Sequence, residues 1–233
     1  MASLPPLEPN YAAALQLIDE AHALDPRPAP NDNPEDNNND DQPPIPFELD
    51  YARKMTRWLA VRAPDASPEL QLACRAQHFR RWELPRTSHP ATRAGYLTWR
   101  AKQKSQAAAQ LTELLTSSPT IQPPIPKEAV QRIGALVRKE GLGRTTSTTS
   151  TTNDEGREEG GDSETQVLED VACLVFLDGQ LEGFERTSEL EEEKLVGILR
   201  KTWGKMSGRG RELALGMELG ERAGALVAKA LVV

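Results

Sequence analysis

The longest uninterrupted apolar run in the chain, residues 171–177, constrains its fold more than any other feature. The run reads Val-Ala-Cys-Leu-Val-Phe-Leu, so a helix made from it would be apolar on every side and would have to be buried all round. A run of this length would also suit a buried strand. Val167 before it, and Leu181 and Phe184 after it, continue a helical period. We therefore predict a central helix over residues 164–184.

The other apolar residues recur at steps of three and four, which is the spacing of amphipathic helices, and no stretch alternates with period two. Prolines and glycines mark the ends of these patterns. The remaining predicted helices cover residues 10–24, 47–62, 68–83, 93–117, 127–140, 189–206 and 209–232. The predicted fold class is all-α, a single bundle of about seven to eight helices.

Two stretches are too polar to contribute to such a core. Residues 25–46 combine several prolines with a run of Asp and Asn, and residues 143–162 contain no apolar side chain. Neither can bury enough apolar surface to offset the entropy lost on ordering. We predict a disordered linker at 25–46 and a disordered insertion at 143–162. The helical domain would then be assembled from residues 1–24, 47–142 and 163–233.

Composition also limits where the protein works. The N-terminal segment lacks the basic and apolar regions of a signal peptide, and no apolar run approaches the ~20 residues of a membrane span. We expect a cytoplasmic protein without membrane contact. Cys74 and Cys173 both lie within apolar helical patterns, so we expect buried, reduced thiols. A net charge of −7 makes nucleic acid an improbable partner.

One segment departs from this acidic average. Residues 75–104 contain eight basic side chains and a single acidic one, Glu83, together with His78 and His89. Arginine outnumbers lysine six to two in this segment, which favours planar, bidentate recognition of phosphate or carboxylate groups. A charge run of this kind is also typical of a solvated helix face.

We predict a basic site around His78 for a small phosphorylated or carboxylated ligand. Its polar centre would consist of His78, Glu83 and Asp170. Glu83 could instead hold the helix end through a neighbouring arginine, and Asp170 could simply complement its helix dipole. The cations expected to contact the ligand are Arg80, Arg81, Arg86, Arg93, Arg100 and Lys139.

Several long motifs carry a family resemblance. They are LDYARKM at 49–55, RAQHFRRWELPR at 75–86, RAGYLTWR at 93–100 and LEDVACLVFL at 168–177. These segments resemble the signatures of an uncharacterised family, domain of unknown function 4202, over nearly all of the foldable chain. Because that family has no established activity, the resemblance implies a fold and no function.

The order of elements has a more distant resemblance to the HD-type metal-dependent phosphohydrolases. Those all-helical enzymes hold a divalent metal with a His on one helix, a His-Asp pair on the next and an Asp on a late central helix. Only His78 and Asp170 stand at matching places here, with Tyr51 where the first His would be. A divalent metal is therefore possible, but two ligands fall short of the three or four that a site needs.

The sequence leaves three functional hypotheses open. The first is a domain that binds a small anionic ligand in a basic pocket around His78. The second is a degenerate or divergent HD-type hydrolase acting on a phosphate ester. The third is a non-catalytic interaction protein whose basic face docks an acidic partner or RNA.

Overall fold

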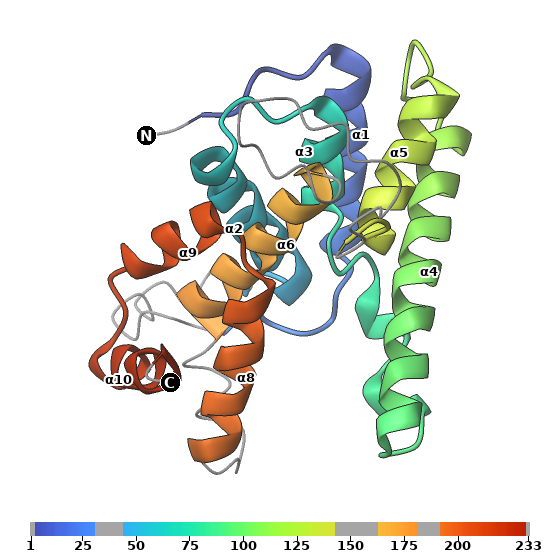
Figure 1. Ribbon diagram of the computed structural model, residues 1–233. Coiled ribbons are helices and arrows are strands. Elements are labelled where there is room, and N and C mark those ends of the chain that lie inside the picture. The colour runs from blue at the N-terminus through green and yellow to red at the C-terminus, as the bar shows by residue number, and fades with distance from the viewer. Residues whose placement is uncertain (1–2, 31–43, 143–162, 181–191, 232–233) are drawn as a thin grey trace, which may run out of the picture.

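The protein is built from helices in the computed structural model (Figure 1), which describes residues 3–30, 44–142, 163–180 and 192–231. Over these ranges it has nine α-helices: α1 (Pro9–His22), α2 (Phe47–Arg62), α3 (Pro68–Arg75), α4 (Arg93–Ser117), α5 (Lys127–Arg138), α6 (Ser163–Val175), α8 (Glu192–Lys205), α9 (Gly208–Leu215) and α10 (Glu221–Leu231). The described residues contain no strand, only an isolated bridge between Pro28 and Pro46. The predicted all-α class is confirmed, whereas the predicted number of about seven to eight helices is too low. None of the described helices combines the length and apolarity needed to cross a membrane.

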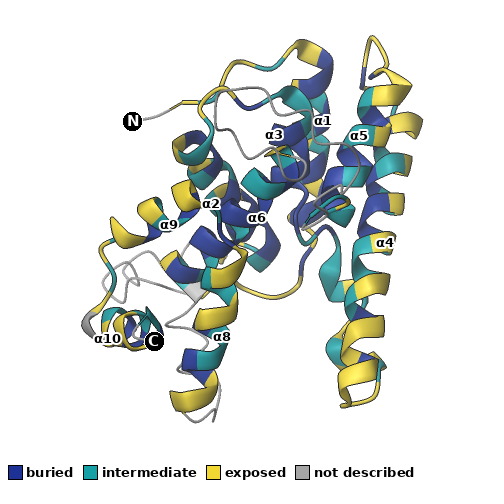
Figure 2. Cartoon of the chain, viewed as in Figure 1, coloured by how far each residue is buried: buried dark blue, intermediate teal, exposed yellow. Residues whose placement is uncertain are grey.

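The predicted central helix is α6, which continues as a π-helical turn, η4 (Phe176–Gln180). It contacts α2, α3, α5, α8 and α9. Leu168, Val171 and Leu174 are completely buried, as expected for a helix that is apolar on several sides. Figure 2 shows α6 as mostly buried between its neighbours. Residues 181–184 of the prediction lie outside the described part of the chain.

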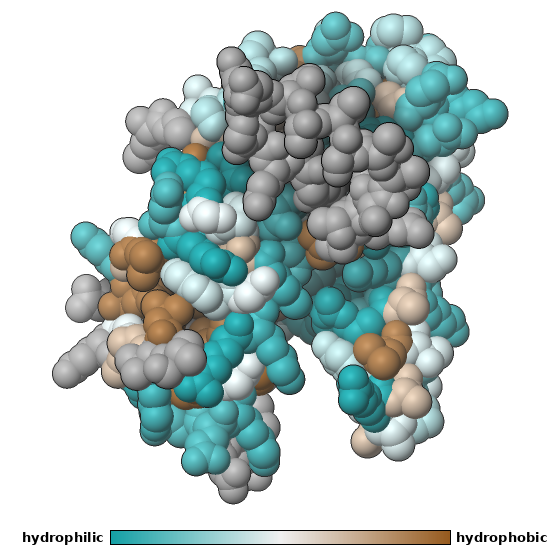
Figure 3. Space-filling model, in the orientation of Figure 1, coloured by the Kyte–Doolittle hydropathy of each residue, from teal (hydrophilic) through white to brown (hydrophobic). Residues whose placement is uncertain are grey.

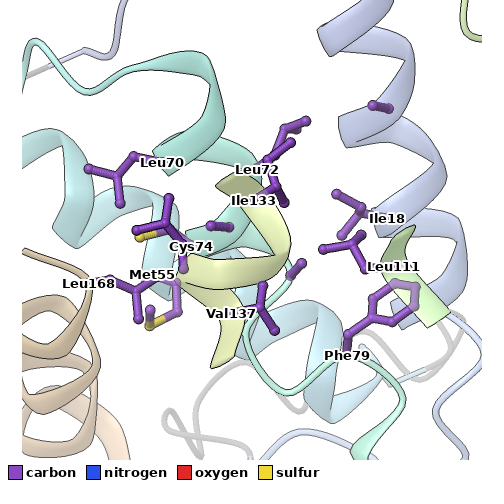
Figure 4. Close-up of a cluster of buried hydrophobic side chains, with 14 of the residues drawn as sticks. Ile18, Met55, Leu70, Leu72, Cys74, Phe79, Leu111, Ile133, Val137 and Leu168 are labelled. Atoms are coloured by element: carbon purple, nitrogen blue, oxygen red, sulfur yellow. The ribbon is translucent and has the colours of Figure 1, made fainter. Parts of the chain in front are cut away.

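Two apolar clusters fill the interior. The larger contains residues from each of the six helices α1 to α6. Figure 4 shows five of its members, one from each of five helices: Ile18, Met55, Leu111, Ile133 and Leu168. The smaller joins the end of α6 to α8, α9 and α10. Cys74 and Cys173 are free and buried, one in each cluster, and burial raises the pKa of both thiols to about 12. Both cysteines are therefore unreactive core residues, as predicted.

The longest helix, α4, forms one side of the molecule and packs mainly against α5 (Figure 1). Its buried face carries Trp99, Ala108, Leu111 and Leu115, while much of the opposite face is exposed (Figure 2). The bounds of α4 match the predicted 93–117 because Thr92 caps the first turn through Gly95 N–H.

The prediction of one helix over residues 68–83 is wrong in its second half, because α3 ends at Arg75. The chain then turns through His78 and Arg80, whose φ angles of 64° and 48° lie in the left-handed region. Two short 3₁₀ turns follow, η2 (Arg81–Glu83) and η3 (Arg86–Ser88). Phe79 lies in this turn and is buried. Its spacing from the apolar residues of α3 equals that of one helical face, which is why the sequence predicts a helix here.

The last predicted helix, 209–232, is in fact two helices, α9 and α10. Gly216 caps the end of α9, and the residues between Gly216 and Gly220 are not helical. Glycine is unfavourable inside a helix because of its conformational freedom, and Gly216 and Gly220 flank the interruption.

The ends of the segment 25–46 are ordered, contrary to the prediction of a linker without structure. Ala29 N–H donates to Ile45 O, and Phe47 N–H donates to Arg27 O, at 2.8 Å each. Asp25 is buried and accepts from Arg27 Nε at 2.9 Å. Residues 31–43, and the predicted insertion at 143–162, lie outside the described residues.

Candidate functional site

The basic segment after α3 lines a small cavity, which we call the His78 cavity. It has a volume of about 70 Å³ and lies between the turn at residues 77–84, α4 and the end of α5. Its lining residues are Gln77, His78, Phe79, Arg80, Arg81, Leu84, Arg100, Gln103, Lys104, Gln106, Ala107, Val137 and Lys139. This volume has room for a few waters or one small oxyanion, because a single water needs about 10–15 Å³ by the same measure.

The backbone around the His78 cavity is unusual. Over the described residues only three non-glycine residues have positive φ, namely His78, Arg80 and Lys139, and all three line this cavity. Each such residue costs on the order of 1–2 kcal/mol relative to a right-handed conformation. Strained residues of this kind cluster at functional sites. Their coincidence at one cavity therefore marks it as the candidate site.

Polar contacts on both sides hold the strained turn in place. The carboxylate of Glu48, fully buried on α2, accepts Trp82 N–H at 3.2 Å and also accepts from Arg27 Nη2 at 3.2 Å. On the other side, Trp99 Nε1 and Gln103 Nε2 on α4 donate to Leu84 O at 3.0 and 3.2 Å. The turn is thereby fastened to two helices.

His78 is neutral in this arrangement. Arg81 Nη1 lies 2.7 Å from His78 Nε2, and because a guanidinium can only donate, Nε2 must accept and Nδ1 must carry the hydrogen. The ring stacks on Tyr51 with centroids 4.1 Å apart, and Nδ1 is buried without a hydrogen-bond partner among the described residues. Burial, followed by the charges of Arg81, Lys139 and others, holds the pKa of His78 well below its usual value.

Three cations at the cavity have no carboxylate partner in the described part of the chain: Arg81, Arg100 and Lys104. Arg81 donates to His78 and lies 5.2 Å from the Trp99 ring centroid. Burial lowers the pKa of Arg81 and of Lys104, and in both cases Arg100 lowers it further. In both cases burial and neighbouring positive charge outweigh the attraction of a nearby carboxylate, Glu48 for Arg81 and Glu169 for Lys104.

The other two cations of the cavity are matched. Lys139 pairs with the buried carboxylate of Glu169. Burial raises the pKa of Glu169, but Lys139, Lys205 and Lys104 together outweigh this effect and lower it. Arg80 lies 4.0 Å from Glu83 and 5.5 Å from the Phe79 ring centroid.

The structure brings five of the nine predicted site residues to one cavity. They are His78, Arg80, Arg81, Arg100 and Lys139. Three others do not line it. Glu83 is exposed and accepts from Gln110 Nε2 at 2.7 Å, Arg86 donates to His89 O and Pro90 O, and Arg93 is exposed at the start of α4.

Asp170 is not part of this site. Its Oδ2 accepts from Arg62 Nε at 2.8 Å, and its Oδ1 accepts from Ser207 N–H at 2.8 Å and from Gln166 Nε2 at 3.0 Å. Ser207 Oγ donates to Oδ2 at 2.5 Å. With both oxygens engaged and the side chain fully buried, Asp170 joins α2, α6 and the start of α9. It does not meet His78 at the cavity.

Lys104 is the main cavity residue that the predicted set lacks. It lies four residues after Arg100, one helical turn along the same face of α4. This spacing could have identified Lys104 as a site residue. Lys102 lies two residues from both Arg100 and Lys104, so it falls on another face of the helix and is exposed. Gln77 and Gln103 were missed as well, because nothing in their spacing distinguishes them from surface glutamines.

The described residues contain no group of three or more His, Cys, Asp or Glu side chains arranged to hold a metal ion. The two candidate metal ligands, His78 and Asp170, do not share a site. The hypothesis of a divalent metal on these two residues has no support in the described part of the chain.

Comparison with known proteins agrees with the family resemblance. The family model described as "Domain of unknown function (DUF4202)" matches residues 12–227. No curated protein and no solved structure matches the sequence.

The strained backbone makes a testable prediction at Arg80. Arg80→Gly and Arg80→Ala remove the same guanidinium, but only glycine relieves the left-handed φ. We expect Arg80→Gly to be more stable than Arg80→Ala by on the order of 1 kcal/mol. Urea denaturation of both variants measures this difference.

Arg57, exposed in the middle of α2, is the matched control. There the order should reverse, with Arg57→Gly less stable than Arg57→Ala by about 1 kcal/mol, since the backbone is helical. Equal or lower stability of Arg80→Gly would mean that the turn at Arg80 is not strained.

Proposed function

The chain belongs to the DUF4202 family, which has no assigned activity, and we propose that this member binds a small oxyanion, a phosphoryl or carboxylate group, in the His78 cavity. One observation carries the proposal: Arg81, Arg100 and Lys104 surround one cavity without a carboxylate partner in the described residues. An anion between them would supply the missing charge.

The chemistry of the lining suits this ligand. Guanidinium groups donate in a planar fork that matches phosphate and carboxylate oxygens, and Lys104 adds a mobile point charge. The site is partly desolvated, which strengthens charge–charge attraction relative to bulk water. Gln77 and Gln103 also line the cavity and can donate to oxygen. These features favour binding over a purely structural role, in which the protein's own carboxylates would neutralise the arginines.

The two rival hypotheses have less support. An HD-type hydrolase would require Asp170 at the same centre as His78, but Asp170 is engaged with Arg62 and Ser207. A non-catalytic protein that docks an acidic partner or RNA would present its charge on an open face. The unpartnered cations here gather around one small hollow of about 70 Å³, which suits a small ligand.

The test compares two lysines of α4. Inorganic phosphate and sulfate, added at constant ionic strength, should raise the Tm of the full chain, because a ligand that binds only the folded state stabilises it. Lys104→Met should weaken phosphate binding about tenfold or more, since charge-assisted hydrogen bonds are lost. The same substitution at Lys102, exposed on the same helix, should leave binding unchanged.

The outcomes separate the hypotheses. The proposal fails if neither phosphate, sulfate nor a simple carboxylate shifts the Tm, or if Lys102→Met and Lys104→Met lose affinity equally. Binding of a polyanion that declines equally in both variants would favour the interaction hypothesis. Lys104→Met should also raise the stability of the ligand-free protein slightly, because burial and the neighbouring cations disfavour the charge of Lys104 in the folded state.

A further inference from the structure

A larger groove adjoins the His78 cavity, and we call it the α4 groove. Its volume is about 570 Å³, and it is lined by Tyr96, Leu97, Arg100, Ala101, Lys104, Ser105, Arg138 and Lys205. Arg100 and Lys104 line both hollows, so these two cations form a wall that the cavity and the groove share. Figure 3 shows the surface deeply notched between α4 and α8, with apolar atoms on the α4 side of the notch.

The α4 side of the groove combines apolar and cationic chemistry. Tyr96 and Leu97 are 44% and 57% exposed, which is high for residues of this size. They precede Arg100 by one helical turn and Lys104 by two. Arg86 lies 6.0 Å from the Tyr96 ring centroid, and Trp99 lies 5.9 Å from it, so the exposed ring is supported from within the protein.

The opposite side of the groove is also cationic. Arg138 pairs with Glu140, and Lys205 lies 3.5 Å from Glu169. Neither carboxylate is among the residues that line the groove, and the lining contains no acidic side chain among the described residues. The lining therefore contributes four cations and no carboxylate, and the two cations without an ion pair in the described residues, Arg100 and Lys104, are those that also line the His78 cavity.

Building on the proposed oxyanion site, we propose that the ligand is a phosphate ester with a flat ring, the chemical class of the nucleoside monophosphates. The phosphoryl group binds in the His78 cavity, between Arg81 and Lys104. The ring lies in the α4 groove against Tyr96. Base–aromatic stacking tolerates any base because every base has a π-face.

Size favours a small molecule over a macromolecule. The groove falls within the ~300–1,000 Å³ range of small-molecule pockets. The adjoining His78 cavity, with a volume of about 70 Å³, has room for one phosphoryl group rather than for a longer chain. A ligand that ends in a phosphate monoester fits both constraints, because it has one anionic terminus and one ring.

The experiment measures the affinity of the full chain for inorganic phosphate, ribose 5-phosphate and adenosine 5′-monophosphate by calorimetry. We expect all three to bind, and the nucleotide to bind at least about tenfold more tightly than ribose 5-phosphate, because only it carries a ring that stacks. Tyr96→Ala should remove this advantage and leave the affinity for inorganic phosphate within about twofold of the wild type, because Tyr96 does not line the cavity.

Two exposed leucines give a matched control. Leu97 is 57% exposed in the groove, and Leu215 is 65% exposed at the end of α9. Leu97→Ser should weaken nucleotide binding and spare phosphate binding, while Leu215→Ser should affect neither. Equal affinities for the nucleotide and ribose 5-phosphate, with phosphate still bound, would overturn the ring site and leave the oxyanion site standing. If none of the three ligands binds, both proposals fall together.

Discussion

Asp170→Ala is expected to lower the free energy of unfolding by about 3–5 kcal/mol, because removing one partner leaves a mostly buried charge uncompensated. The guanidinium of Arg62, only 16% exposed, would lose the carboxylate at 2.8 Å. Ser207 N–H would lose its acceptor as well, and Ser207 Oγ would lose the acceptor that orients it as the N-terminal cap of α9. Urea denaturation monitored by far-UV circular dichroism measures the change.

Two further variants provide a control and a second test of this prediction. Asp65→Ala, at an exposed aspartate, should change stability by no more than about 0.5 kcal/mol. Gly210→Ala should also destabilise the protein, because its Cβ would lie 2.7 Å from Asp170 Cγ. Asp170→Ala within about 1 kcal/mol of the wild type would refute the structural role of this carboxylate, since removal of one partner of a buried ion pair costs about 3–5 kcal/mol.

The Asp170 contacts explain why the HD-type resemblance could suggest a site that the fold does not make. In the sequence, an aspartate at the start of the most apolar helix could serve either as a ligand or as a structural anchor. The deciding facts are the positions of Arg62 and Ser207, which lie far from Asp170 in the chain. Contacts between such distant positions depend on how helices cross, which periodicity within one helix does not record.

Helix positions could be predicted well where periodicity and proline agree. α2 and α4 have the predicted bounds, 47–62 and 93–117, because apolar residues recur on one face and a break follows each helix. The turn after Arg75 could not be predicted. It contains no glycine, and His78 and Arg80 adopt left-handed φ only because surrounding contacts impose it.

The candidate site, like the fold, could be predicted only in part. The cluster of six arginines around His78 could be recognised from charge and composition, and three of them, Arg80, Arg81 and Arg100, line the cavity. Arg86 and Arg93 are equally basic in the sequence but lie outside it, because the chain folds back at η3 before α4 begins. Local charge density therefore predicts a region, whereas the backbone turn decides which of its cations meet.

The pH dependence of stability should report on His78. Its folded-state pKa lies below the unfolded value of about 6.5, mainly because of burial and then because of Arg81 and Lys139. The stabilising contribution of the neutral ring is thus present above about pH 6.5 and is lost as the pH falls, since the unfolded chain takes up a proton that the folded chain resists. Between pH 7.5 and 5.5, the stability of the ligand-free protein should decline.

His78→Asn is the variant of choice, because asparagine tolerates a left-handed φ and does not titrate. The wild type minus this variant isolates the histidine, with a slope of at most about 1.4 kcal/mol per pH unit below pH 6.5. Urea denaturation at several pH values measures it. Parallel pH profiles for the two proteins would show that His78 titrates normally and that the cavity does not raise the cost of charging it.

The same measurement in millimolar sulfate connects this titration to the proposed ligand. Sulfate keeps its charge throughout this pH range, so any change in its affinity comes from the protein. An anion among Arg81, Arg100 and Lys104 offsets the repulsion that lowers the pKa of His78, and sulfate should therefore stabilise the wild type more at pH 5.5 than at pH 7.5. In His78→Asn this increase should be largely lost. If sulfate stabilises both proteins equally at the two pH values, the imidazole and the anion do not share a site.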